Sequence, residues 1–207
     1  MKVTDVKHGY TGPRDAKFDD IKKELLELLD NARNEGVVDS EVNKYLDLIN
    51  SHPDYVTSSS CYGRIVLIDL PDSTKKNSEF LWKQHNPVSA DDAWDALQNA
   101  EGKFVWLNAD PLILHVSCRD IDAANALLKV KASAGMKRGG IFSISGNRVQ
   151  IEFEGTYRMA VPVKKDGELL VDKNYCSLLV EQANSKFEKN VAMWERFAGE
   201  FSSRLEP

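Results

Sequence analysis

The residues with the clearest chemical potential gather in one short stretch of the sequence. Residues 57–64 read Thr-Ser-Ser-Ser-Cys-Tyr-Gly-Arg and stand directly before the apolar run at residues 65–68. Hydroxyl and backbone N–H groups at a strand end can hold a carboxylate or a phosphate, and an arginine can bind either anion through two hydrogen bonds. Glycine lets the backbone approach a ligand closely. The stretch indicates a ligand site, with a Ser/Thr-rich edge strand leading into a turn as the alternative.

Two histidines are candidates for proton transfer. His85 follows Trp82 in the segment Trp-Lys-Gln-His, where an indole, a cation and an imidazole could cover a flat ring. His115 lies within Ile-Leu-His-Val, and alternate residues of a strand face opposite sides of a sheet. His115 therefore either shares a core face with Ile113 or points toward a ligand. Cys61 could also be a nucleophile with one of these histidines as its base, although no nucleophile elbow surrounds it.

A basic, glycine-rich segment is the third candidate. Residues 135–140 read Gly-Met-Lys-Arg-Gly-Gly, and Lys129 and Lys131 precede them. Such a patch suits phosphate oxygens, and a glycine-rich helix end with solvated lysines is the alternative interpretation. Neither Gly-x-Gly-x-x-Gly nor the Gly-Lys-Ser/Thr ending of a phosphate-binding loop is present, so a Rossmann or P-loop nucleotide site is not supported.

The elements that would position these residues follow from the spacing of apolar side chains. Apolar residues at helical spacing, with capping and stop residues at the ends, predict helices over residues 18–32, 40–49, 89–100, 120–134 and 183–205. Short runs rich in β-branched residues predict strands over residues 55–60, 64–69, 104–107, 112–118, 141–145, 148–153 and 158–163. The polar stretch 70–86, which contains Lys75 and Lys76, is predicted to be a long loop.

Composition bounds the class of protein. The chain has 207 residues, of which 42% are hydrophobic and 29% charged, as in ordinary globular proteins. The net charge of −5 excludes a uniformly basic coat but allows a local basic patch. No apolar run approaches the ~18 residues of a membrane span. Three distant cysteines, with no export signal in residues 1–13, predict reduced thiols and a cytoplasmic protein, and no metal-ligand spacing is present.

A faint internal repeat suggests how the chain is organised. Residues 58–66 and 143–149 both read as strand, glycine turn, arginine and strand. No low-complexity linker divides the sequence. The pattern predicts a single domain, residues 1–207, made of two fused pseudo-repeats at roughly 1–118 and 119–207.

Five segments taken in order carry a wider resemblance. They are residues 58–65, 82–85, 111–116, 135–141 and 179–186. Together they resemble the tRNA wybutosine-synthesizing protein 3 family in its stand-alone archaeal-type form. The resemblance implies an α+β fold in which two similar halves form one barrel-like mixed sheet, flanked by helices that include a long C-terminal helix. It also implies an S-adenosylmethionine-dependent methyltransferase, which methylates N4 of a 4-demethylwyosine-type guanosine 3′ of the anticodon of tRNA-Phe.

The resemblance also implies roles for particular residues. Cofactor binding carries over onto Ser59, Ser60, Cys61, Gly63, Arg64, Asn184, Lys186 and Asn190, and the catalytic histidines are His85 and His115. The glycine-rich loop of the family matches Gly135, Arg138 and Gly140. Tyr62 and Gly139 stand where serine is usual in the family, which puts hydrogen bonds from those two side chains in doubt.

The anticodon loop of tRNA is the expected partner. A base read by a protein is splayed from its loop onto an aromatic side chain, and we expect Trp82 to be that platform. With a net charge of −5, the RNA contacts should be confined to Lys129, Lys131, Lys137 and Arg138.

Two other functions stay open from the sequence. A non-catalytic RNA-binding module could use the same basic loop and aromatic residues. A hydrolase that depends on Cys61 is the second. Binding of S-adenosylmethionine tests the first alternative, and full activity of Cys61→Ser would exclude the second.

Overall fold

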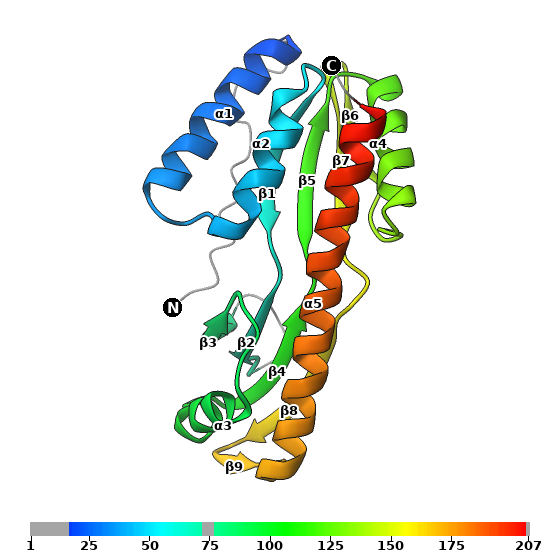
Figure 1. The fold of residues 1–207 in the computed structure, drawn as a ribbon. Helices are drawn as coiled ribbons and strands as arrows, with labels where there is room; N and C mark the ends of the chain where they lie inside the picture. The colour runs from blue at the N-terminus through cyan, green and yellow to red at the C-terminus, as the bar shows by residue number, and fades with distance from the viewer. Residues whose placement is uncertain (1–16, 72–76, 206–207) are drawn as a thin grey trace. The chain divides into compact units, whose positions relative to one another are not determined.

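The computed structural model describes residues 17–71 and 77–205, so residues 1–13, Lys75 and Lys76 of the sequence predictions lie outside it (Figure 1). The chain divides into two compact units. Unit 1 contains residues 63–111 and 157–190, and unit 2 contains residues 17–62, 112–156 and 191–205 among those described. Each unit is thus assembled from segments that are separate in the sequence.

Unit 1 is built on a five-stranded antiparallel sheet in the order β3-β2-β4-β8-β9. Its strands are β2 (Arg64–Asp69), β3 (Glu79–Gln84), β4 (Phe104–Asp110), β8 (Met159–Lys165) and β9 (Glu168–Leu169). Val105, Leu107 and Ala109 alternate as the buried residues of β4, as expected for a strand packed on one face. Helix α3 (Ala90–Asn99) is capped by Ser89, whose side chain accepts a hydrogen bond from the Asp92 N–H, as the sequence predicts.

Strand β3 corrects the prediction of a long loop over residues 70–86. Residues 79–84 pair with β2 at the edge of the sheet, with Trp82 opposite Leu67. None of the six is buried. An edge strand is held through backbone hydrogen bonds on one side, so it needs no strong apolar alternation, and the sequence pattern therefore lacks the usual signal.

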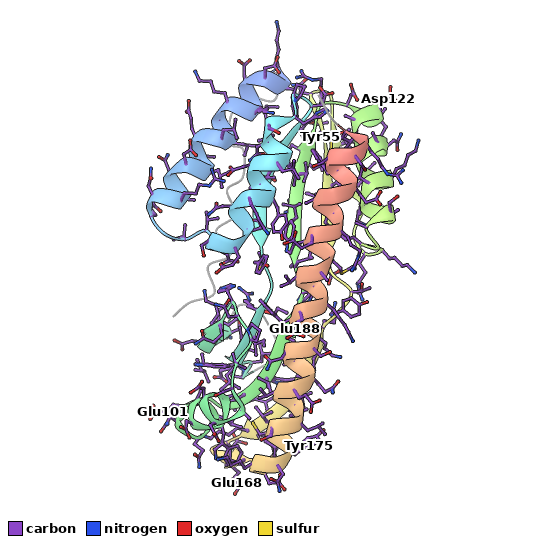
Figure 2. The ribbon with its side chains drawn as sticks, viewed as in Figure 1. Tyr55, Glu101, Asp122, Glu168, Tyr175 and Glu188 are labelled. Carbon is purple, nitrogen blue, oxygen red and sulfur yellow. The ribbon has the colours of Figure 1, made fainter. Side chains whose placement is uncertain are left out.

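Unit 2 is built on a four-stranded antiparallel sheet in the order β1-β5-β7-β6. Its strands are β1 (Tyr55–Cys61), β5 (Ile113–Cys118), β6 (Ile141–Ser145) and β7 (Arg148–Glu154), and its helices include α1 (Phe18–Asn34), the 3-10 turn η1 (Ser40–Val42), α2 (Asn43–Ser51) and α4 (Ile121–Ser133). Helix α1 buries Phe18, Ile21 and Leu25 against Val56 of β1. The Tyr55 hydroxyl donates to the Ala123 carbonyl at the start of α4, 3.1 Å away, and Figure 2 labels Tyr55 together with Asp122 of that helix.

The last helix, α5 (Lys173–Arg204), confirms the predicted long C-terminal helix and begins ten residues before the predicted range. Its residues 173–190 belong to unit 1 and its residues 191–204 to unit 2. In unit 2 it buries Trp194, Phe197 and Phe201, and the Phe197 ring lies edge-on to Phe153 of β7 at 5.4 Å between centroids. Among the helices that the structure describes, none is long and apolar enough to cross a membrane.

The α+β class is confirmed, but the strands do not form one barrel-like mixed sheet. The paired strands of the described chain make two antiparallel sheets. The segments on either side of Asp110-Pro111 do not pair as a hairpin, because β4 joins one sheet and β5 the other. The two sequence segments that resemble each other also differ in structure: β1 and β2 belong to different sheets, whereas β6 and β7 form one hairpin. The pseudo-repeat boundaries stay a prediction.

Candidate functional site

The hydroxyl-rich end of β1 lies beside the histidine of β5 in unit 2. The register pairs Ser59 with His115 and Cys61 with Ile113, after an irregularity between Thr57 and Ser59. Residues directly opposite each other in an antiparallel pair share a face, so Ser59, Cys61 and His115 lie on one face of this sheet. Ser60 pairs with Leu114 and lies on the opposite face, with the buried residues of β5.

His115 is not a core histidine. The side chain of His115 is 26% exposed, and Ile113, on the same face of the sheet, is 36% exposed. The next strand of the sheet, β7, places Glu152 directly opposite His115, and His115 Nε2 lies 3.0 Å from a Glu152 carboxylate oxygen. Glu152 was not singled out from the sequence. It stands among polar residues that alternate with buried Val149, Ile151 and Phe153, a pattern that marks a half-exposed strand but no particular chemistry.

The glycine-rich loop packs its backbone against the same strand. Gly139 has φ +79°, and a Cβ there would lie 2.3 Å from the Glu152 carbonyl oxygen, so no side chain fits this loop conformation. A serine at position 139, which the resemblance leads one to expect, would need a different backbone there. Arg138 is exposed and forms an ion pair with Glu154 at 3.2 Å.

Lys131 lies inside unit 2, in contrast to the exposed Lys129 and Lys137. Its Nζ donates to the Gly139 carbonyl at 3.1 Å and lies 6.0 Å from the centre of the Phe153 ring. Burial lowers the pKa of Lys131 below its ordinary value. These contacts give Lys131 a structural role in holding the glycine-rich loop.

Arg64, Gly63 and His85 come together in unit 1. Arg64 Nε donates to Asp110 at 3.0 Å, and the guanidinium lies 4.4 Å from the centre of the Phe80 ring. His85 Nδ1 lies 3.1 Å from the Gly63 carbonyl oxygen. Gly63 has φ +109°, a conformation that glycine adopts without strain. Asp110 and Phe80, which orient Arg64, were not singled out from the sequence because neither belongs to a recognisable motif.

Two asparagines of α5 differ in what they hold. The Asn184 amide accepts from the Val88 N–H and donates to the Val88 carbonyl, so it anchors the segment that follows His85. Asn190 is fully buried; its Nδ2 donates to the Tyr157 carbonyl at 2.8 Å, and its Oδ1 has no hydrogen-bond partner among the described residues. Lys186, on the same helix, is half-buried.

Tyr62 and Trp82, two aromatic residues considered above, pack largely against other side chains. Tyr62 is 7% exposed and stacks with Tyr45 and Trp194, whose indole N–H donates to the Tyr62 carbonyl. A serine, which the resemblance leads one to expect at this position, could not make these ring contacts. Trp82 is half-buried and opposite Leu67, which lies on the packed face of its sheet.

In the described residues, the cysteines and acidic side chains form neither a disulfide nor a metal site. Cys61, Cys118 and Cys176 form no disulfide, and burial raises the pKa of the Cys118 thiol to about 12, so that thiol stays protonated. Across residues 17–71 and 77–205, no group of three or more His, Cys, Asp and Glu side chains is placed to hold a metal ion.

Comparison with known proteins gives the family of the chain. The model of the family described as Methyltransferase TYW3 matches residues 20–203, and the chain belongs to this methyltransferase family. A relative from Methanocaldococcus jannaschii, named tRNA(Phe) 7-((3-amino-3-carboxypropyl)-4-demethylwyosine(37)-N(4))-methyltransferase, is 38% identical over 87% of this chain and 95% of its own length. The tRNA wybutosine-synthesizing protein 3 homolog of Xenopus laevis is 36% identical over 78% of this chain and 66% of its own.

A solved structure supports the same relationship. The structure of the PH1069 protein from Pyrococcus horikoshii is similar with a TM-score of 0.85 and 32% identity, over 88% of this chain and 95% of that one. The family resemblance predicted from the five sequence segments is therefore confirmed.

Proposed function

We propose that this methyltransferase acts on tRNA-Phe, where it methylates N4 of a 4-demethylwyosine-type base 3′ of the anticodon. The observation that carries the proposal is the family match over residues 20–203, together with relatives of nearly the same extent that are named for this reaction. The half-buried histidines suit it, because methylation of a ring N–H needs an acceptor for the departing proton.

S-adenosylmethionine is the methyl donor that we propose. It would supply an electrophilic methyl group on a sulfonium. The buried Oδ1 of Asn190 has no partner within the described part of the chain, and as an acceptor it would suit the donor's ammonium group. The other residues that the resemblance assigns to the cofactor also stay proposed contacts. They are Ser59, Ser60 and Cys61 of unit 2, and Gly63, Arg64, Asn184 and Lys186 of unit 1. Among them, Asn184 acts by anchoring the segment after His85.

The proposed RNA contacts include exposed cations near the glycine-rich loop. Lys129, Lys137 and Arg138 are exposed and suited to phosphates, while Lys131 supports the loop from inside. Gly135 and Gly140 shape the same loop. Trp82, in unit 1, stays a proposed aromatic contact of the anticodon loop, and Trp82→Ala should then weaken tRNA binding.

Labelled methyl transfer tests the proposal directly. The purified chain is incubated with labelled S-adenosylmethionine and tRNA-Phe carrying the 4-demethyl base, and nucleoside analysis locates the label. We expect label at N4, and none with tRNA-Phe that carries an unmodified guanosine. An absence of label with the correct substrate, despite tRNA binding, would instead favour the RNA-binding module. Full methylation by Cys61→Ser is expected and would exclude a cysteine nucleophile.

A further inference from the structure

The sheet of unit 2 fixes which nitrogen of His115 is available for chemistry. The carboxylate of Glu152 only accepts hydrogen bonds, so the proton of a neutral His115 imidazole lies on Nε2, which faces Glu152 at 3.0 Å. The opposite nitrogen, Nδ1, then carries the lone pair. His115 Nδ1 has no hydrogen-bond partner in the described part of the chain.

Glu152 is itself held from the side away from His115. Its backbone N–H donates to the Gly140 carbonyl at 2.9 Å, and its own carbonyl packs against Gly139. Lys131 in turn fixes the Gly139 carbonyl. The loop, Glu152 and His115 are therefore linked by backbone and side-chain hydrogen bonds, which limit rotation of the imidazole.

An exposed aromatic ring stands next to this pair. Phe142 of β6 is 53% exposed, and its ring centre lies 5.1 Å from the centre of the His115 imidazole. An exposed phenyl ring on a sheet is a stacking surface for an unpaired base. A base stacked on Phe142 would present its edge to His115.

We propose that His115, Glu152 and Phe142 form the site that takes the N–H edge of the extruded aromatic base. The inference rests on the proposed function. Phe142 stacks the base, His115 Nδ1 accepts its proton, and Glu152 is the positioning residue that holds the imidazole and stabilises the imidazolium. The ring N–H bond breaks toward Nδ1, the nitrogen forms a bond to the methyl carbon, and the bond from that carbon to sulfur breaks with its electron pair going to sulfur.

His85 is less suited to this role. Its Nδ1 faces the Gly63 carbonyl, a neutral acceptor, at 3.1 Å. The carboxylate of Glu152 at 3.0 Å from His115 offers a countercharge to an imidazolium, which a carbonyl does not.

The first test is spectroscopic and needs no activity. Nitrogen-15 NMR of the full chain without ligands, above pH 8, should show His115 with its proton on Nε2, and Glu152→Ala should give a mixture of the two neutral forms. The matched control is Gln150→Ala, two residues along the same face of β7, which should leave His115 unchanged. A proton on Nδ1 in the unaltered chain would overturn the proposal, whether or not the chain methylates tRNA.

The second test asks whether Glu152 acts through His115. We expect single-turnover methylation to fall about 100-fold or more in His115→Ala and about 10-fold or more in Glu152→Ala. The double variant should be no slower than His115→Ala alone, because residues that act as a unit are not additive. A double variant slower by the product of both effects would contradict a positioning role. If the unaltered chain transfers no methyl group, the proposed function fails while the NMR result still stands.

The third test concerns the stacking surface. Phe142→Ala should weaken binding of tRNA-Phe carrying the 4-demethyl base about 5- to 150-fold, the range seen when a stacking aromatic is removed. Ile144→Ala is the matched control, because Ile144 is 68% exposed on the same strand and is apolar but not aromatic. Equal effects of both substitutions, or no effect of Phe142→Ala, would reject Phe142 as the platform.

Discussion

Two buried hydroxyl groups in unit 2 differ in whether they are hydrogen-bonded, and therefore in their expected contribution to stability. Ser117 is fully buried, and across residues 17–71 and 77–205 its Oγ meets no hydrogen-bond partner. Thr57 is also buried, but its Oγ1 and its N–H both engage the side chain of Asn50. A buried polar group without a partner has lost its hydration without compensation, whereas a paired one has not.

We therefore expect Ser117→Ala and Thr57→Val to act in opposite directions. Ser117→Ala should be neutral or should raise the free energy of unfolding by up to about 1 kcal/mol. Thr57→Val should lower it by about 1–2 kcal/mol, because Asn50 Nδ2 then loses the Oγ1 that accepts its hydrogen bond. Denaturant unfolding of both variants checks this. A loss for Ser117→Ala as large as that for Thr57→Val would mean that the Ser117 hydroxyl makes a stabilising contact.

At the residue scale, the sequence pointed to candidate groups but not to their partners. His115 and Arg64 were singled out because imidazole and guanidinium are chemically distinctive. Glu152 and Asp110 were not, because an acidic residue on a strand is ordinary until strand register places it opposite a histidine or an arginine. Register depends on long-range pairing, which residue types and local periodicity do not contain.

At the scale of elements, most helices and strands were predictable from apolar spacing and end signals. Strands β6 and β7 and the helix after Asp120 are examples, since Asp120 accepts a hydrogen bond from the Ala123 N–H at the start of α4. Strand β3 was missed because it lies at a sheet edge. The division of the strands between two sheets was also not predictable, because the local patterns of β4 and β5 are alike while their partners differ.

The end of helix α3 depends on a side chain from a different element. Lys164 of β8 is 9% exposed, and its Nζ donates to the carbonyls of Leu97, Gln98 and Ala100 at 3.3, 3.0 and 2.8 Å. The last carbonyls of a helix have no partner within the helix, and a cation there also interacts favourably with the helix dipole. Lys164 thereby fastens α3 to the sheet of unit 1.

Lys164→Met tests how strongly the end of α3 depends on the hydrogen bonds of Lys164. Methionine keeps most of the apolar stem but removes all three hydrogen bonds, so we expect the free energy of unfolding to fall by about 2–3 kcal/mol. Hydrogen exchange should accelerate first in the α3 amides. Lys165→Met is the control, since Lys165 is the next residue of β8 and is exposed, and it should change stability by less than about 0.5 kcal/mol. Equal decreases in the free energy of unfolding for the two variants would show that Lys164 stabilises the protein through its apolar side-chain carbons alone, and not through its hydrogen bonds.

For the whole molecule, the charge balance sets a limit on how RNA is bound. The net charge of −5 opposes a polyanion at long range, so binding has to come from a local group of cations. In the proposed footprint Lys129, Lys137 and Arg138 are exposed, and three neutralised phosphates of a single-stranded loop correspond to a slope of about −2 in log affinity against log salt. Affinity for tRNA-Phe should then fall about 20-fold between 50 and 200 mM salt.

Paired charge reversals separate the local patch from the net charge. Lys129→Glu with Lys137→Glu, and Lys103→Glu with Lys165→Glu, each lower the net charge by four, and all four lysines are exposed. If binding depends on the patch, the first pair should reduce the salt slope toward about −1 and weaken binding at least 10-fold, because two phosphate contacts are lost. The second pair should leave the slope unchanged and cost less than about 3-fold. Equal effects from the two pairs, measured by titration of tRNA-Phe at several salt concentrations, would show that overall repulsion rather than this patch governs binding.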